Sequence, residues 1–225
     1  MLNKKKIWIF GDSYSTPYSN KEVGAWAKEY IKWKGYEPKT FGDILGDELE
    51  VEVMHFGIGG IDNDTLFESI YKSAPLIQKE DIVIIGWSSL TRFRLATLQN
   101  KFATIIPNFG IHNSLSFISK NTIEEILVNR TLWSYYKELY DRIEFLNWLF
   151  KDTKLIQWTP FYFNSIKIYG DASITTIHTE TNEEVKDYHY SEKGHRELAN
   201  TFLEFINNDK LRNKINSLCT ISNLI

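Results

Sequence analysis

A serine near the start of the chain and an Asp/His pair near its end have the residue types of a nucleophile and its base. Ser13 follows Gly11-Asp12 directly after the apolar run Ile7–Phe10, and Asp187-Tyr188-His189 precedes a helical pattern. A serine hydroxyl is a poor nucleophile until a histidine removes its proton, and the histidine works best when a carboxylate fixes its tautomer. The pattern therefore predicts a serine hydrolase.

The elements that must position these residues alternate between strand and helix. Short apolar runs predict strands at 6–10, 51–56, 81–86 and 154–158. Periodic apolar residues predict helices at 22–33, 41–49 (capped by Thr40), from Asp62 or Asp64 to about 73, within 122–150, and from Ser191 to about 206. Alternation of this kind predicts an α/β fold, a three-layer doubly wound parallel sheet of flavodoxin-like order.

Two stretches have no clear period. Residues 96–121 and 161–186 are expected to be irregular excursions from one domain that spans 1–225, with a short strand near 174–178. A short tail helix is expected over 209–218. Both excursions are expected to shape specificity.

Composition places the chain among globular proteins. Its 225 residues are 43% hydrophobic and 24% charged, with a net charge of −3, which argues against a nucleic-acid-binding surface. Its single cysteine, Cys219, forms no intramolecular disulfide and no zinc cluster. No segment approaches the roughly 20 apolar residues of a membrane span, and the run at 7–10 is shorter than a signal core of about 7–15 residues. A cytoplasmic protein without a membrane partner is expected, and its oligomeric state is left open.

Marked residues fall at the ends of three predicted strands. Ser13 follows the first strand, 57–63 the second and 86–92 the third. In doubly wound sheets ligands gather at the carboxyl ends of the strands. These segments are therefore expected to meet at one edge of the sheet.

In these segments the chain resembles the SGNH (GDSL-type) hydrolase superfamily. Residues 7–15 match the first block, a strand followed by Gly-Asp-Ser. Residues 55–60 match the second block, Asn-x-Gly-x-x-Gly, with His55 in place of Asn. Residues 187–195 match the last block, an Asp and a His followed by Gly-His. Three blocks in the right order make the resemblance specific.

The resemblance implies a role for each matching residue. Ser13 would be the nucleophile, His189 the general base and then acid, and Asp187 the residue that orients His189. The backbone N–H groups of Ser13 and Gly60 would form part of the oxyanion hole. The resemblance implies no metal and no organic cofactor.

The chain departs from the family pattern in two places. Asp187 and His189 are separated by one residue, where two are commoner. The third block, Gly-x-Asn-Asp, appears as Gly86-Trp87-Ser88-Ser89 and lacks the Asn that donates to the oxyanion. Asn63 is the leading replacement and Ser88 the second, although Asn63 serves equally well as a helix cap.

Other residues near these blocks have two interpretations each. Arg92 either clamps an anionic substrate group or pairs with a nearby carboxylate. Trp87 is either a stacking platform for a sugar or a packed aromatic residue. Asp12 is expected to form a turn, and His195 to be structural.

The expected function is a carboxylic ester hydrolase that removes a small acyl group, such as acetyl, through an acyl-enzyme on Ser13. The predicted loops are polar and aromatic and no long apolar cap helix is predicted, which favours a small-molecule or carbohydrate ester. Acyl transfer to a sugar hydroxyl is one alternative. A binding module that has lost the chemistry is another. A nucleotide-binding protein is disfavoured, because 11–15 lacks the glycines or lysine of a phosphate cradle.

Overall fold

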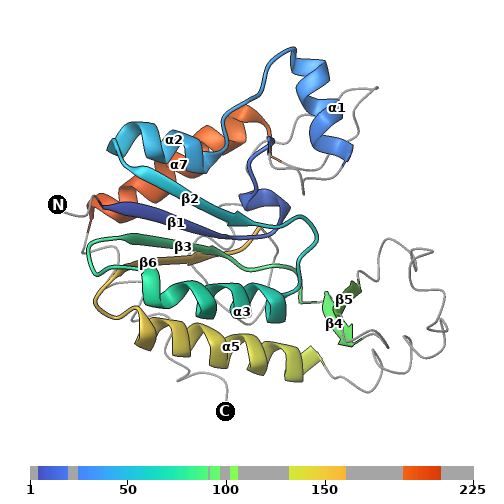
Figure 1. The fold of residues 1–225 in the computed structure, drawn as a ribbon, viewed down its shortest axis with the longest axis vertical. Coiled ribbons are helices and arrows are strands. Elements are labelled where there is room, and N and C mark those ends of the chain that lie inside the picture. Colours follow the sequence, from blue (N-terminus) through green and yellow to red (C-terminus); the bar gives the residue numbers. More distant parts are fainter. Residues whose placement is uncertain are drawn as a thin grey trace.

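The computed structural model describes residues 5–19, 25–90, 92–96, 102–105, 132–160 and 190–208. A four-stranded parallel sheet forms the centre, with strand order β2-β1-β3-β6 (Figure 1). The strands are β1 (Lys6–Gly11), β2 (Glu52–Gly57), β3 (Ile82–Gly86) and β6 (Lys154–Trp158). The order follows the flavodoxin-like pattern, so the predicted α/β fold class and doubly wound sheet are confirmed.

Helices cover both faces of the sheet, because its central strands are apolar on both sides (Figure 1). On β1, Trp8 and Phe10 face α3 (Asn63–Ser73) and α5 (Leu132–Leu149). Ile7 and Ile9 point the other way, towards α2 (Phe41–Leu49) and α7 (Glu192–Asn207). Burial of these side chains in two separate cores holds the three layers together.

Short polar side chains start the helices that the sequence predicts. Asp62 caps α3 by accepting a hydrogen bond from Thr65 N at 2.8 Å, which decides between Asp62 and Asp64. Ser191 caps α7 by accepting from Gly194 N at 3.0 Å. These bonds satisfy backbone N–H groups that have no partner within a helix.

Two short 3-10 helices, one further α-helix and a separate pair of strands complete the described structure. The 3-10 helix η1 (Ser13–Ser15) follows β1, and α1 (Ala25–Lys34) comes next in the chain. A second 3-10 helix, η2 (Ala74–Leu76), extends α3. The strands β4 (Phe93–Ala96) and β5 (Phe102–Ile105) pair with each other in antiparallel fashion, outside the main sheet.

This hairpin corrects the expectation of an irregular excursion from residue 96. Each of its strands has only four residues, too few for a periodic apolar pattern to be recognised. The rest of that excursion, the excursion at 161–186 with the strand near 174–178, and the tail helix at 209–218 lie outside the described residues.

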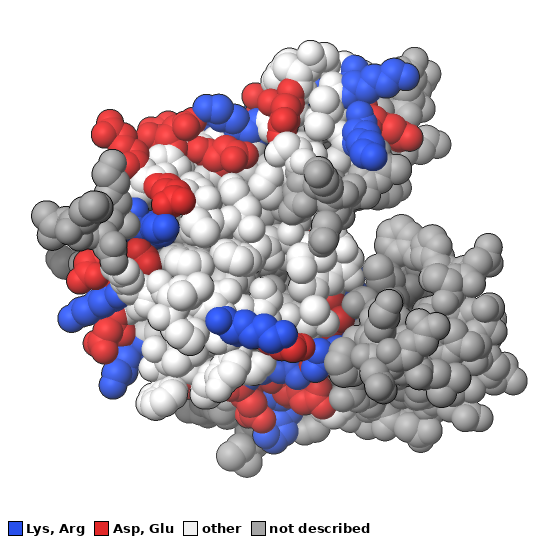
Figure 2. All heavy atoms as spheres, in the orientation of Figure 1, with Lys and Arg blue, Asp and Glu red and all other residues white. Residues whose placement is uncertain are grey.

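No helix among the described residues is long and apolar enough to cross a membrane. Within the same residues, no group of three His, Cys, Asp or Glu side chains could hold a metal ion. Acidic and basic side chains are interspersed on the described part of the face in Figure 2.

Candidate active site

Ser13 begins η1, directly beyond the carboxyl end of β1, and 9% of its surface is exposed. The preceding Asp12 builds the turn, as predicted. Its carboxylate accepts from Tyr14 N at 3.1 Å, and its carbonyl oxygen accepts from Ser15 N and the Thr16 hydroxyl, each at 2.9 Å. These bonds fix the backbone on both sides of Ser13.

Two glycines allow the neighbouring strands to close around this turn. A Cβ atom at Gly57, the last residue of β2, would lie 2.7 Å from the carbonyl oxygen of Ser15. A Cβ at Gly86, the last residue of β3, would lie 2.7 Å from the Ser15 hydroxyl oxygen. At Gly57 the contact is with backbone, so only glycine permits this approach without displacing the turn that carries Ser13, whereas at Gly86 the Ser15 side chain would have to move.

Asn63, the first residue of α3, is fixed by two hydrogen bonds to the loop after β3. Its Nδ2 donates to the Ser88 carbonyl oxygen at 2.9 Å, and its Oδ1 accepts from Ser88 N at 2.8 Å. Only one orientation of the amide satisfies both bonds, because nitrogen donates and oxygen accepts. The second N–H of Nδ2 is left to bind a ligand.

The Ser88 hydroxyl is engaged on both sides. It accepts from Arg92 Nη1 at 2.8 Å and lies 3.4 Å from Asp12 Oδ2, to which it donates. Ser88 has no exposed surface. Because its hydrogen points to a buried carboxylate, the geometry favours Asn63 over Ser88 as the side-chain donor to an oxyanion.

Arg92 pairs with the carboxylate of Asp12, which is the second interpretation of this residue. Nη1 lies 2.9 Å from Asp12 Oδ2, and the two side chains are only 11% and 1% exposed. A buried carboxylate needs such a partner, because removing a charge from water is costly. The structure thus shows the pairing of Arg92 with a carboxylate, and contact of Arg92 with a substrate anion stays a prediction.

Trp87 lies in the core and does not form a stacking surface. Its side chain has no exposed area, and its Nε1 donates to Gln157 Oε1 at 2.9 Å. Its backbone N donates to the Trp158 carbonyl oxygen at 2.8 Å, which continues the pairing of β3 with β6. The expectation that Trp87 contacts substrate is corrected, because it extends a fully buried strand.

Gly60 lies in the turn between β2 and α3. Its φ of 76° is in the left-handed region, where glycine is favoured. The turn is closed by Ile61 N, which donates to the Ile58 carbonyl oxygen at 3.2 Å. Among the described residues no acceptor takes the Gly60 N–H, which is compatible with the proposed donation to an oxyanion.

Asp187 and His189 lie outside the described residues. The chain is described again from Tyr190, whose ring centroid lies 5.1 Å from that of Tyr14. The Tyr190 carbonyl oxygen accepts from the Tyr18 hydroxyl at 3.1 Å. The residue after His189 therefore packs against the residue after Ser13. Burial, with the nearby Tyr14 and Asp12, raises the pKa of the Tyr190 phenol, so it stays neutral.

His195 and His55 are both structural in this arrangement. The buried His195 accepts from Phe41 N at 3.3 Å through Nδ1, which joins α7 to α2 as expected of a structural histidine. His55 Nε2 lies 3.4 Å from Asp43 Oδ1, on the face of β2 that packs against α2.

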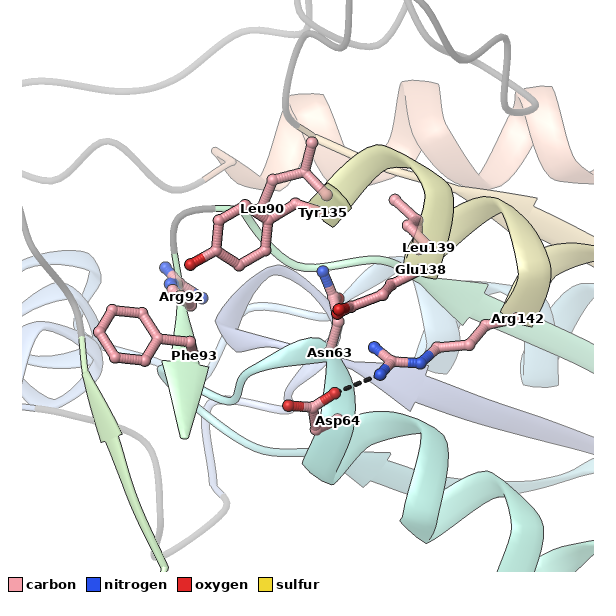
Figure 3. Close-up of a pocket in the computed structure, with 9 residues that line it drawn as sticks. All are labelled: Asn63, Asp64, Leu90, Arg92, Phe93, Tyr135, Glu138, Leu139 and Arg142. Carbon is pink, nitrogen blue, oxygen red and sulfur yellow. Dashed lines mark hydrogen bonds and ion pairs between the residues drawn. The ribbon is translucent and has the colours of Figure 1, made fainter. Parts of the chain in front are cut away.

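A cleft beside this network contains residues that the sequence did not single out. It is narrow and lies between the start of α3, β4 and α5 (Figure 3). Tyr135, Glu138 and Arg142 line it from α5 and share one face at helical spacing. That polar stripe is visible in the sequence, but nothing there connects α5 with the ends of β1 and β3.

Comparisons with known proteins do not show a family for this chain. No protein-family model matches the chain. No curated protein matches it either. Among solved structures, a chain assigned as a lipolytic protein of the G-D-S-L family from Desulfitobacterium hafniense is 13% identical, with a TM-score of 0.39. The match covers 89% of this chain and 99% of that chain. A likeness of that size does not show a shared family.

Proposed function

We propose that the protein is a serine esterase of the SGNH type, which removes a small acyl group from a carbohydrate or another polar alcohol. Ser13 would attack the ester carbonyl, and His189, oriented by Asp187, would take its proton. The N–H groups of Ser13 and Gly60 and the Asn63 amide would stabilise the tetrahedral oxyanion. His189 would then protonate the leaving alkoxide, and water would release the acyl group.

The observation that carries this proposal is the two-point bond between Asn63 and Ser88. The family pattern places the missing Asn in the loop after the third strand, and here an amide from α3 is held against that loop at 2.8 and 2.9 Å. A donor held in advance stabilises developing charge without reorganisation during the reaction. The contact between Tyr14 and Tyr190 adds support, because it joins the neighbours in sequence of Ser13 and His189.

The direct test is turnover of p-nitrophenyl acetate by the protein and by Ser13→Ala. We expect Ser13→Ala to lose at least about 10³-fold in kcat while its thermal unfolding stays unchanged. Ser15→Ala is the matched control, because Ser15 lies in the same turn but has no role in the reaction. Equal turnover by Ser13→Ala and the parent protein would remove the proposal.

Labelling with a fluorophosphonate separates an enzyme from a binding module. An activated serine forms a covalent adduct at Ser13, detected by mass spectrometry of the intact chain and its peptides, whereas a pocket that only binds does not react. Analysis of products with a sugar acceptor present separates hydrolysis from acyl transfer.

A further inference from the structure

We infer that Arg92 is a positioning residue, which aligns two donors of the oxyanion site without touching a reacting atom itself. This inference rests on the proposed esterase function. The two donors come from different parts of the chain: the backbone N–H of Ser13, after β1, and the side-chain amide of Asn63, at the start of α3.

The Arg92 guanidinium joins the turn after β1 to the loop after β3. Its Nη1 donates to Asp12 Oδ2 at 2.9 Å and to the Ser88 hydroxyl oxygen at 2.8 Å. An Nη atom carries two hydrogens, so both bonds can form at once. Because Asp12 directly precedes Ser13, one nitrogen atom holds the turn of the proposed nucleophile at a fixed distance from Ser88.

Ser88 connects Arg92 with Asn63. Its hydroxyl accepts from Arg92, and its backbone N–H and carbonyl oxygen bind the Asn63 side chain at 2.8 and 2.9 Å. A shift of Ser88 would therefore move the Asn63 amide relative to Ser13. Such a shift matters for catalysis, because a donor stabilises an oxyanion well only at about 2.7–3.1 Å from it.

Arg92 is itself held in place, and its shape matters as well as its charge. Its backbone N donates to the Ser89 carbonyl oxygen at 3.2 Å, and its side chain is largely buried. Lysine has the same charge, but it carries that charge as a compact ammonium group on a flexible stem without the planar fork of arginine. Arg92→Lys therefore separates the balance of the Asp12 charge from the alignment of the two donors.

The experiment compares Arg92→Lys with Arg94→Lys on p-nitrophenyl acetate, which has no anionic group for either cation to bind. We expect Arg92→Lys to lower kcat by about tenfold or more with KM within about twofold, because the full oxyanion develops only in the transition state. Arg94 pairs with Glu68 at 2.8 Å, so Arg94→Lys is the matched control and should keep both constants within about twofold. Thermal unfolding measures the folded fraction of each variant.

The affinity of an acetyl-sized trifluoromethyl ketone measures the alignment in folded molecules. The Ser13 oxygen adds to the ketone carbon, the carbonyl oxygen becomes an oxyanion, and the serine proton passes to His189. We expect Arg92→Lys to weaken this binding by about the same factor as it lowers kcat/KM, because the adduct resembles the transition state. A residue that contributed only to stability would leave the affinity per folded molecule unchanged.

Ser88→Ala tests the same connection if Arg92→Lys does not fold. It removes the hydroxyl that Arg92 binds, but keeps the ion pair with Asp12 and the backbone bonds to Asn63. We expect a loss of several-fold in kcat with little change in KM.

The outcomes separate this inference from the proposed function. Unchanged kcat in Arg92→Lys and in Ser88→Ala, a loss confined to KM, or an unchanged affinity for the ketone would overturn the role of Arg92, while Ser13-dependent turnover would still support an esterase. No Ser13-dependent turnover by the parent protein would overturn the esterase and, with it, this role.

Discussion

Two buried aspartates lie at opposite ends of the parallel sheet. Asp12 follows β1 at the carboxyl edge, and Asp81 precedes β3 at the amino edge. Asp81 accepts hydrogen bonds from Lys6 N and Trp8 Nε1, both at 2.8 Å, and from Gln78 N at 2.9 Å. Asp12 accepts from Tyr14 N, the Ser88 hydroxyl and the Arg92 guanidinium.

The partners of the two carboxylates differ in kind. The three donors to Asp81 are neutral N–H groups, and they tie the starts of β1 and β3 together. Asp12 has a charged partner on the loop after β3 and adjoins Ser13. A buried carboxylate is therefore not itself a sign of catalysis. The distinction lies in whether a partner also lines a cleft and whether the carboxylate adjoins the proposed nucleophile. Arg92 lines such a cleft, and Asp12 precedes Ser13.

Asp12→Ala should have the largest effect on stability. It leaves the guanidinium of Arg92 largely buried without its carboxylate, which costs about 3–5 kcal/mol in the free energy of unfolding. Urea unfolding measures this loss, and Asp12→Asn, which keeps an acceptor for Tyr14 N, should lose less. Equal stability of Asp12→Ala and the parent protein would show that the ion pair contributes nothing.

Asn63→Ala should have the largest effect on rate among variants that fold. Removal of one oxyanion donor typically costs about 10²–10³ in kcat, or about 2.7–4 kcal/mol in the barrier. Steady-state kinetics with p-nitrophenyl acetate measures the change. Asn63→Asp keeps the acceptor for Ser88 N but places negative charge near the oxyanion, so it should be at least as slow. A change confined to KM would argue against the assigned role.

Asp81→Ala should lower stability without changing activity. It leaves two backbone N–H groups and one indole N–H without their acceptor. Because water can reach some of these groups, we expect a loss of about 1–3 kcal/mol in the free energy of unfolding. Activity per folded molecule should equal that of the parent protein. A fall in kcat as large as that of Asn63→Ala would contradict the contrast between the two ends of the sheet.

Substitution of Asp43, at the start of α2, should have the smallest effect on stability. Burial raises its pKa, but hydrogen bonds from His55 and from the hydroxyl and N–H of Thr40 outweigh burial and lower the pKa from 3.8 to about 2. The carboxylate therefore stabilises the fold above about pH 4, and this contribution is lost as the pH falls towards 2. Because Asp43 is more than a third exposed, we expect about 1 kcal/mol. Acid unfolding of Asp43→Asn should lack this part of the pH dependence.

Local sequence was sufficient to predict most of the scaffold. The apolar runs of β1 and β3 and the caps Thr40, Asp62 and Ser191 act over a few residues, so their effect can be recognised without a partner. The hairpin of β4 and β5 was missed, because its strands are short and pair only with each other. Within the site, the sequence identified Asn63, Ser88 and Arg92 as candidates but could not say which of them bond to one another.

The order of apolar and polar residues thus determined the layers, the helix starts and the edge of the sheet where Ser13, Asn63 and Ser88 gather. Tertiary structure alone decided that Arg92 neutralises Asp12, 80 positions away in the chain, and that the Asn63 amide is held by Ser88. It also buried Trp87 and placed Glu138 beside the loop after β3. The physical reason is the separation along the chain over which each effect acts. Periodicity and capping depend on near neighbours in sequence. A hydrogen bond or an ion pair between distant residues depends on a distance in space that only folding sets.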